Sequence, residues 1–404
     1  MFFIIIQVGD LKIGNDEKNA INQVLDSGRI SEGEKVREFE YKWADFVGTK
    51  YSVATSSGTG ALLVGLNSLI VSEDFNVTKD SNVITSPITY ASTVNAINLS
   101  NLNPVFVDID FHNFVITPEN IKKHLENVDD LDSYSLLLPV HLMGYACDMN
   151  KISKISKKYG LHLMEDSAQA HGTVYNNKKT GSMSDLSIFS FYIAHNIQVG
   201  EMGAINTNNK NLTEMFRKMK SNGRACGCLI CNRNYGKCPK NIECGEDMDP
   251  RFTHDVIGYN FKTMEFQAAL GISQLKNVED IIKKRNENVK YINEGLDGFS
   301  DLIKLPEYSS DVSYLAYPLV IKDPNKISRK KLRSKLEDEG IETRPLFGSI
   351  PTQQPAYSYL KEEYKNKLSN ADYIGKNGFY IGCHQYLGDE ELDYIVSTFK
   401  KVLN

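Results

Sequence analysis

Three short segments carry small, acidic and hydroxyl residues whose positions suit the binding of a phosphorylated ring. Ser56-Ser-Gly-Thr-Gly60 lies between a predicted strand and a predicted helix, where the N–H groups of a helix N-terminus can bind a phosphate. Asp166 ends an apolar stretch, and a carboxylate there can keep a pyridine nitrogen protonated. Ser190 ends a second apolar stretch. Each segment alone also fits a Ser/Gly turn or a helix-capping aspartate, but together they predict a site for pyridoxal phosphate.

Five of the seven cysteines lie in one short window of the chain: Cys226, Cys228, Cys231, Cys238 and Cys244. Closely spaced thiolates bind both iron–sulfur clusters and structural Zn²⁺. No set of histidines or carboxylates at ligand spacing accompanies them, so a mixed-ligand site is not indicated. We therefore expect a 2Fe–2S cluster or zinc in this loop, with five free thiols as the alternative.

Alternating strands and helices must position these residues. The predicted strands cover residues 51–55, 82–86, 104–108, 135–140, 161–165, 186–191 and 203–206. The predicted helices between and after them include residues 61–70, 90–99, 150–158, 264–275 and 278–296. This alternation predicts an α/β fold with a mostly parallel seven-stranded sheet. We expect a large domain over 1–270, interrupted by a cysteine-rich insertion at 221–250, and a smaller α+β domain over 271–404.

Composition narrows the possible partners and the location of the protein. The 404 residues are 41% hydrophobic and 24% charged, as in an ordinary globular protein. A net charge of −5 gives no indication of nucleic-acid binding. The apolar start, Met1 to Ile6, is too short for a signal sequence, and no segment approaches the roughly twenty apolar residues of a membrane span. We expect a cytoplasmic protein with reduced cysteines.

The order and spacing of the motifs resemble the DegT/StrS-type family of pyridoxal-phosphate-dependent sugar aminotransferases. The matching segments include Ser57-Gly-Thr-Gly-Ala-Leu62, Glu165-Asp-Ser-Ala-Gln-Ala-His-Gly172, Phe189-Ser-Phe-Tyr192 and Gly258-Tyr-Asn260. The resemblance covers essentially the whole chain and implies the fold of aspartate aminotransferase.

The resemblance implies seven cofactor-binding residues, which are Gly58, Thr59, Tyr90, Asp166, Gln169, Ser190 and Asn260. Backbone N–H groups of the first two and the serine hydroxyl would bind the phosphate. The tyrosine would stack on the ring, the aspartate would pair with the ring nitrogen, and the glutamine would contact the ring oxygen. The asparagine would reach the phosphate of a second subunit, so the resemblance implies a homodimer. Of the lesser candidates, His141 is expected to pack near the site, and His384 and Arg344 to face substrate or solvent.

His195 is where the chain departs from the aminotransferases. In that family, the residue five after the serine of Phe-Ser-Phe is the lysine that forms a Schiff base with the cofactor, and here it is His195. An imidazole cannot form that bond but exchanges protons near neutral pH. The same exchange marks the related nucleotide-sugar 3-dehydratases, which use untethered pyridoxamine phosphate and a histidine base. We therefore expect Asp166 and His195 to be the catalytic residues of a 3-dehydratase of a nucleotide-linked 4-keto-6-deoxy sugar in polysaccharide biosynthesis.

Two alternatives stay open: a nucleotide-sugar aminotransferase, and a non-catalytic sensor that binds pyridoxal phosphate or a sugar nucleotide. Gly223-Arg-Ala-Cys-Gly-Cys228 is similar to a segment of the CDP-sugar dehydrase, which holds a 2Fe–2S cluster and takes electrons from a reductase. That enzyme also uses a cysteine where this chain has Ala168, so the match is incomplete. The implied partner is either a ferredoxin-type reductase or glutamate as the amine donor.

Overall fold

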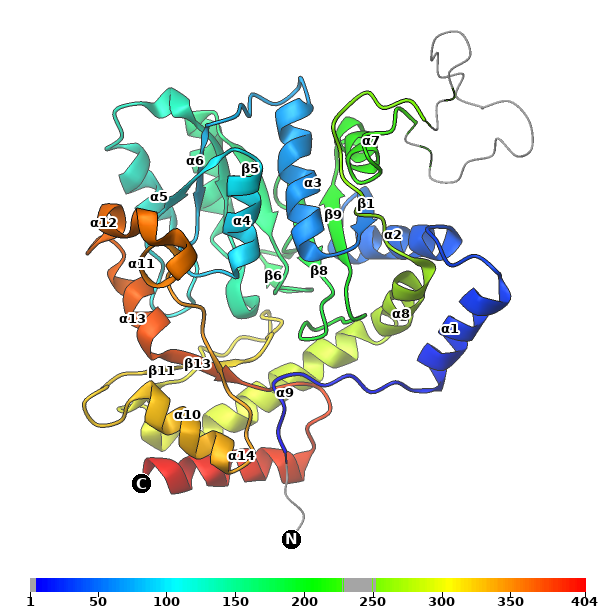
Figure 1. The fold of residues 1–404 in the computed structure, drawn as a ribbon. Helices are drawn as coiled ribbons and strands as arrows, with labels where there is room; N and C mark the ends of the chain where they lie inside the picture. The colour runs from blue at the N-terminus through cyan, green and yellow to red at the C-terminus, as the bar shows by residue number, and fades with distance from the viewer. Residues whose placement is uncertain (1–4, 227, 229–248, 250–251) are drawn as a thin grey trace.

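A seven-stranded sheet forms the centre of the molecule (Figure 1). The computed structural model describes residues 5–226, 228, 249 and 252–404. The strands follow the order β1-β9-β8-β5-β4-β2-β3. Their bounds are Tyr51–Thr55 (β1), Asn82–Thr85 (β2), Asn103–Phe106 (β3), Tyr134–Leu138 (β4), His162–Asp166 (β5), Leu186–Ser190 (β8) and Gly203–Thr207 (β9). Only β9 runs antiparallel to its neighbours, so the predicted mostly parallel sheet is confirmed.

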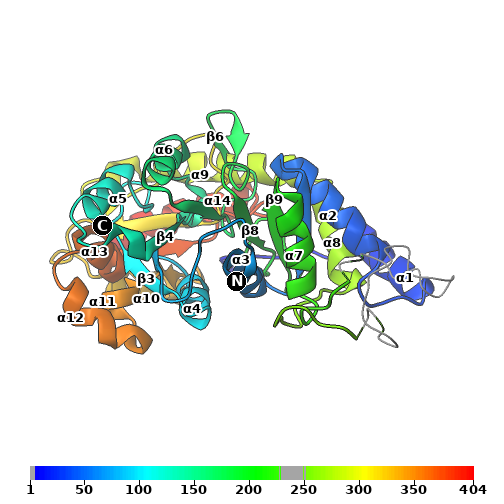
Figure 2. The same cartoon turned by 90° about the horizontal axis from the view of Figure 1, so that it is seen from above.

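Helices cover both sides of this sheet, with α3, α4 and α7 on one side and α6 on the other (Figure 2). The bounds of the helices in this part of the chain are Asn15–Asp26 (α1), Glu34–Val47 (α2), Gly58–Val71 (α3), Ala91–Leu99 (α4), Pro118–Leu125 (α5), Met149–Tyr159 (α6) and Lys210–Met219 (α7). Adjacent residues of one strand therefore enter different clusters of apolar side chains: Ile188 packs in one and Phe189 in the other. This alternation follows from the two-residue period of a strand and explains the near-continuous apolar runs in the sequence.

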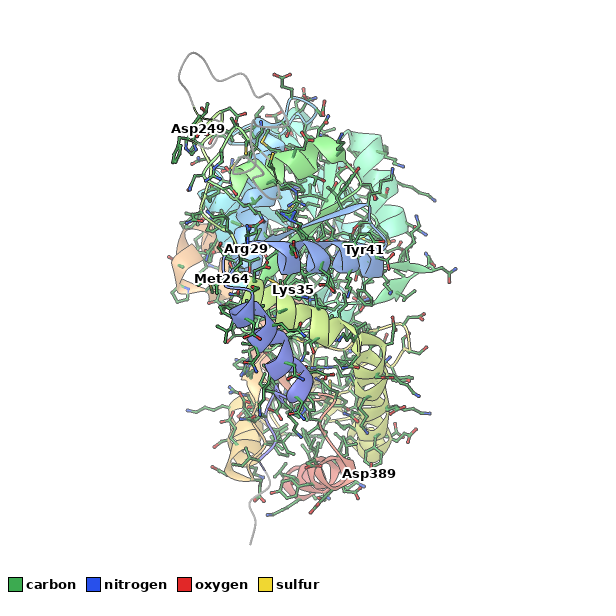
Figure 3. The ribbon with its side chains drawn as sticks, turned by 90° about the vertical axis from the view of Figure 1, so that its right-hand side faces the viewer. Arg29, Lys35, Tyr41, Asp249, Met264 and Asp389 are labelled. Atoms are coloured by element: carbon green, nitrogen blue, oxygen red, sulfur yellow. The ribbon has the colours of Figure 1, made fainter. Side chains whose placement is uncertain are left out.

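A second, four-stranded sheet lies in the C-terminal part, in the order β10-β11-β13-β12. Its strands are Ile303–Lys304 (β10), Tyr317–Ile321 (β11), Arg344–Pro345 (β12) and Gly378–Ile381 (β13). The helices are Glu265–Leu275 (α8), Val278–Leu296 (α9), Arg329–Asp338 (α10), Ile350–Gln353 (α11), Lys361–Tyr364 (α12), Ser369–Asn377 (α13) and Asp389–Leu403 (α14). Figure 3 shows α1, α2 and α8 together on one face, with Lys35 and Met264 among them.

The N-terminal residues pack against the C-terminal part of the chain. Ile6 forms a parallel bridge with Ile341, and the Val8 N–H donates to the Glu342 carboxylate at 2.8 Å. The division of the chain into 1–270 and 271–404 stays a prediction, and most of the 221–250 insertion lies outside the described residues. In the described part of the chain, no helix is long and apolar enough to cross a membrane.

Candidate active site

The register of four neighbouring strands brings three of the predicted site segments to one edge of the sheet. Asp166 at the end of β5 pairs with Ile188 of β8. Two residues further on, Ser190 pairs with Gly203 of β9, which in turn pairs with Thr55 at the end of β1. The turn from Ser56 to Gly60 therefore follows β1 at the same edge as Ser190. Carboxyl ends of parallel strands are where open α/β sheets bind their ligands.

The start of α3 forms a cradle for an anion. The hydroxyl of Ser57 caps the helix by accepting the Gly60 N–H at 3.0 Å, whereas the N–H groups of Gly58 and Thr59 make no hydrogen bond to the described residues. These free donors stand at the positive end of the helix dipole. A Cβ on Gly58 would lie 2.7 Å from the Cβ of Ser190. Only glycine therefore lets the backbone approach the serine so closely.

Asp166 is a buried carboxylate with hydrogen bonds on both oxygens. Oδ2 accepts from the Thr93 hydroxyl at 2.7 Å, and Oδ1 accepts from the Ala168 N–H at 3.1 Å. Burial raises the pKa of Asp166, and the hydrogen bonds from Thr93 and Ala168 oppose that rise. Since no lysine or arginine of the described part forms an ion pair with it, a protonated ring nitrogen would complement this carboxylate. Sequence reasoning missed Thr93, which lies on α4 and has no motif of its own.

Tyr90 and Gln169 lie at the same edge. Tyr90 caps α4 and leaves 63% of its surface exposed, with its ring 5.8 Å from that of Phe347. An exposed ring of this kind can stack on a flat ligand. The Oε1 atom of Gln169 accepts from the Met143 N–H at 3.0 Å. This contact orients the side-chain amide, and its NH₂ group makes no hydrogen bond to the described residues.

His195 is half-buried in the turn that follows β8. Its Nδ1 lies 3.3 Å from the carbonyl oxygen of Tyr192. A carbonyl only accepts, so Nδ1 carries the proton of the neutral ring and Nε2 presents a free lone pair. Burial lowers the pKa of His195 to about 4, and the nearby Arg285 acts in the same direction. At neutral pH the ring is therefore an uncharged proton acceptor.

A second imidazole supports the first. The ring of His171 lies nearly parallel to that of His195, with centroids 5.9 Å apart and an interplanar angle of 22°. Its Nδ1 accepts the Ile197 N–H at 3.4 Å. Sequence reasoning noted this histidine only as part of the motif Glu165 to Gly172. Its position two residues after Gln169 was a signal, but nothing linked it to residue 195.

Behind the site, His141 and Glu165 form a fully buried pair. Nε2 of His141 lies 3.0 Å from the Glu165 carboxylate, and Nδ1 accepts the Cys147 N–H at 3.1 Å. The carboxylate also accepts from the backbone N–H groups of Gly181 and Met183. His141 therefore has a satisfied packing role, as expected, and the pair holds the end of β5 that carries Asp166.

The predicted asparagine and cysteines are exposed, half-buried or outside the described residues, whereas His384 is buried and Arg344 is half-buried. Asn260 is exposed, and its Oδ1 accepts from Lys262 Nζ at 2.5 Å. Cys226 and Cys228 are half-buried, whereas Cys231, Cys238 and Cys244 lie outside the described residues. Among the residues that the structure does describe, no three His, Cys, Asp or Glu side chains lie close enough to hold a metal ion. The predicted cysteine site therefore stays a prediction.

Comparisons with known proteins cover almost the whole chain. A sequence profile of the DegT/DnrJ/EryC1/StrS aminotransferase family matches residues 11–400. Lipopolysaccharide biosynthesis protein RfbH of Salmonella typhimurium is 30% identical over 398 residues, which cover 96% of this chain and 90% of that protein. GDP-perosamine synthase of Escherichia coli O157:H7 is 31% identical over 386 residues, which cover 95% of each. The structure of E. coli GDP-4-keto-6-deoxy-D-mannose-3-dehydratase with bound hydrated PLP is similar with a TM-score of 0.85 at 27% identity, covering 98% of this chain and 100% of that one.

Proposed function

This chain belongs to the DegT/DnrJ/EryC1/StrS aminotransferase family, and we propose that it is a pyridoxamine-phosphate-dependent 3-dehydratase of a nucleotide-linked 4-keto-6-deoxy sugar. The relatives include both a 3-dehydratase and GDP-perosamine synthase. Similarity alone therefore does not decide whether the enzyme removes a hydroxyl group from the sugar or adds an amino group to it. The choice rests on His195.

The residues of the site fit pyridoxal or pyridoxamine phosphate. The free N–H groups of Gly58 and Thr59, with the Ser190 hydroxyl beside them, would bind the phosphate. Asp166 would hold the ring nitrogen, since it is a buried carboxylate that lacks a lysine or arginine partner in the described part. Tyr90 would stack on the ring. When bound, pyridoxamine phosphate would supply an amine for the 4-keto carbon and a ring that stores an electron pair.

His195 is the observation that carries the dehydratase proposal. It stands in the turn after Ser190, at the edge where the site residues meet, and it cannot bond covalently to an aldehyde. Its Nε2 lone pair is free, because Nδ1 donates to Tyr192. The ring is also neutral at physiological pH, because its pKa lies near 4. Such a group accepts a proton and passes it on to a departing hydroxyl, which is the work of a base in an elimination.

Among the described residues, the buried lysines and Lys179 already have other partners. Two lysines are buried in the described part of the chain. Lys220 Nζ lies 2.9 Å from Glu32 and donates to the Ala54 carbonyl at 2.7 Å, and Lys304 donates to the His112 carbonyl. Lys179 lies over the ring of Phe46 and faces Glu279.

A nucleotide-sugar aminotransferase is the second candidate, because GDP-perosamine synthase is 31% identical to this chain. An aminotransferase of the usual kind needs a lysine that recaptures the cofactor between half-reactions. His195 offers no such bond, so we rank this activity second.

We also propose a homodimer, in which Asn260 reaches the site of the second subunit. Large apolar side chains are exposed near Asn260: Ile257 is 96% exposed and Met264 45%. Met264 forms a bridge with Ser31 and lies on the face shown in Figure 3. Tyr41, which is 74% exposed, lies on the same face in Figure 3, and exposed large apolar side chains on one face are typical of an interface. Turnover would need an electron or amine source, either a ferredoxin-type reductase or glutamate.

Product analysis tests the activity. The purified protein is incubated with pyridoxamine phosphate, glutamate and GDP- or CDP-linked 4-keto-6-deoxy sugars, and the nucleotide sugars are analysed by mass spectrometry. A product that has lost one oxygen atom supports the 3-dehydratase. A product in which an amine replaces the keto oxygen would instead identify an aminotransferase.

A further inference from the structure

A buried imidazole lies directly against His195. His171 is 1% exposed, and its ring is offset but nearly parallel to that of His195. Three aromatic rings enclose its other sides: Trp43 at 5.3 Å, Phe189 at 5.8 Å and Phe191 at 5.2 Å between centroids. The ring is therefore held by close packing, with little freedom to rotate.

Its hydrogen bond fixes its protonation. Nδ1 of His171 accepts the Ile197 N–H, so a neutral ring carries its only proton on Nε2. Ile197 follows His195 by two residues. His171 thus touches the ring of His195 and binds the backbone just beyond it.

Arg285 is the charged side chain that acts on both imidazoles, and it opposes a positive charge on them. Arg285 on α9 is buried and donates to the Tyr314 and Leu315 carbonyls and to the Gln385 side chain. It forms no ion pair within the described residues, so its charge acts on its surroundings. Burial lowers the pKa of His171 well below its usual range, and His195 and Arg285 lower it further. The carbonyls near the two rings act in the opposite direction.

We propose that His171 is a positioning residue for His195: it supports one face of the His195 ring, anchors the backbone after it, and keeps water from the covered face. The proposal rests on the proposed function only in taking His195 as the proton acceptor. His171 is 1% exposed, so it is not itself accessible to substrate. A rigid, dry support of this kind would hold the Nε2 lone pair in one direction and favour the neutral ring.

Two substitutions separate the ring contact with His195 from the hydrogen bond to the Ile197 N–H. His171→Phe keeps an aromatic ring against His195 but removes the acceptor for Ile197. His171→Asn keeps a polar acceptor but removes the ring and opens space for water. His124→Asn is the matched control, because His124 is also partly buried with a pKa lowered by burial but lies on α5, 2.9 Å from the Tyr134 hydroxyl.

The readout is the titration of His195, followed by NMR of the ¹³C-labelled imidazole carbons in the protein without added substrate or cofactor. We expect the pKa of His195 to rise by about one unit, a tenfold change in proton affinity, in His171→Asn. It should stay near the wild-type value in His171→Phe and in the control. An unchanged pKa in His171→Asn would overturn the proposal, as would an equal rise in the control.

A second measurement applies if His171→Asn does not fold. In His171→Phe the Ile197 N–H loses its acceptor, so its hydrogen exchange should accelerate relative to wild type. Unchanged hydrogen exchange at Ile197 would show that the hydrogen bond from the Ile197 N–H to His171 does not hold this backbone segment. Both measurements are made without turnover, so they can fail or succeed independently of whether the enzyme proves to be a dehydratase.

Discussion

Acid titration of His195 provides a quantitative test of the site. The ordinary pKa of a histidine is 6.5, and in this structure burial, assisted by Arg285, lowers the pKa of His195 to about 4. Each unit of pKa corresponds to about 1.4 kcal/mol. Protonating His195 in the folded protein therefore costs at most about 3 kcal/mol more than in the unfolded chain, since the ring is only partly buried.

The sign of the effect on stability follows from this direction. Between pH 6.5 and 4, the unfolded chain binds a proton at this position and the folded protein does not. The contribution of His195 is therefore fully present above pH 6.5 and is lost as the pH falls through about 4. His195→Asn removes the titrating group, so its free energy of unfolding should decline less over this range, by an amount up to about 3 kcal/mol.

The assay combines two measurements. Imidazole ¹³C resonances are followed from pH 8 to pH 3.5, with the His195 signal assigned as the one that is absent in His195→Asn. Urea denaturation at pH 7 and pH 4.5 then gives the stability difference between wild type and variant. We expect the His195 signal to stay constant down to about pH 5 and to move near pH 4. A midpoint near 6.5, with parallel stability curves, would refute the burial of the neutral ring.

Three further predictions concern the phosphate cradle, the carboxylate and the cysteines. Gly58→Ala places a Cβ 2.7 Å from that of Ser190 and should lower the free energy of unfolding by about 1–3 kcal/mol. Gly298→Ala is the control, because a Cβ at this position has no atom within 4 Å. If both variants lost the same stability in urea denaturation, the close approach of Gly58 to Ser190 would be contradicted. Asp166→Asn should weaken pyridoxal phosphate binding at least about tenfold in a fluorescence titration, and unchanged affinity would contradict its pairing with the ring nitrogen. Metal analysis of anaerobically purified protein should find iron with sulfide, or zinc, and lose it in Cys226→Ser; metal-free wild-type protein would contradict the cysteine site.

The sequence predicted the elements of the large sheet well, because their signals are local. Apolar runs of four to six residues marked the strands, and α9 begins and ends where its periodicity predicts, at Val278 and Leu296. The strand β12 is only two residues long, since only Arg344 and Pro345 pair with β13. The Glu342 side chain instead accepts the Val8 N–H. Contacts between the chain ends, such as this one, have no local signal.

The candidate site was predicted only in part, for a similar reason. Asp166 and Ser190 end apolar strands, so their positions at the sheet edge could be read from the sequence. Thr93 and Arg285 lie on helices α4 and α9. Their contacts with the site depend on how these helices pack in the folded protein, which the local sequence does not specify. The stacking of His171 on His195 depends on how the turn after β8 folds back toward the segment after β5, and neither residue type nor spacing specifies that turn.

The central claim is that His195 leaves the cofactor without a covalent tether, and borohydride reduction tests it most directly. The protein is incubated with pyridoxal phosphate, reduced, denatured and weighed by mass spectrometry, with His195→Lys treated in parallel. We expect wild-type protein of unchanged mass and a covalently labelled His195→Lys variant. A stoichiometric covalent label on one lysine of the wild-type protein, equal to that of His195→Lys, would contradict the proposed untethered chemistry and favour an aminotransferase.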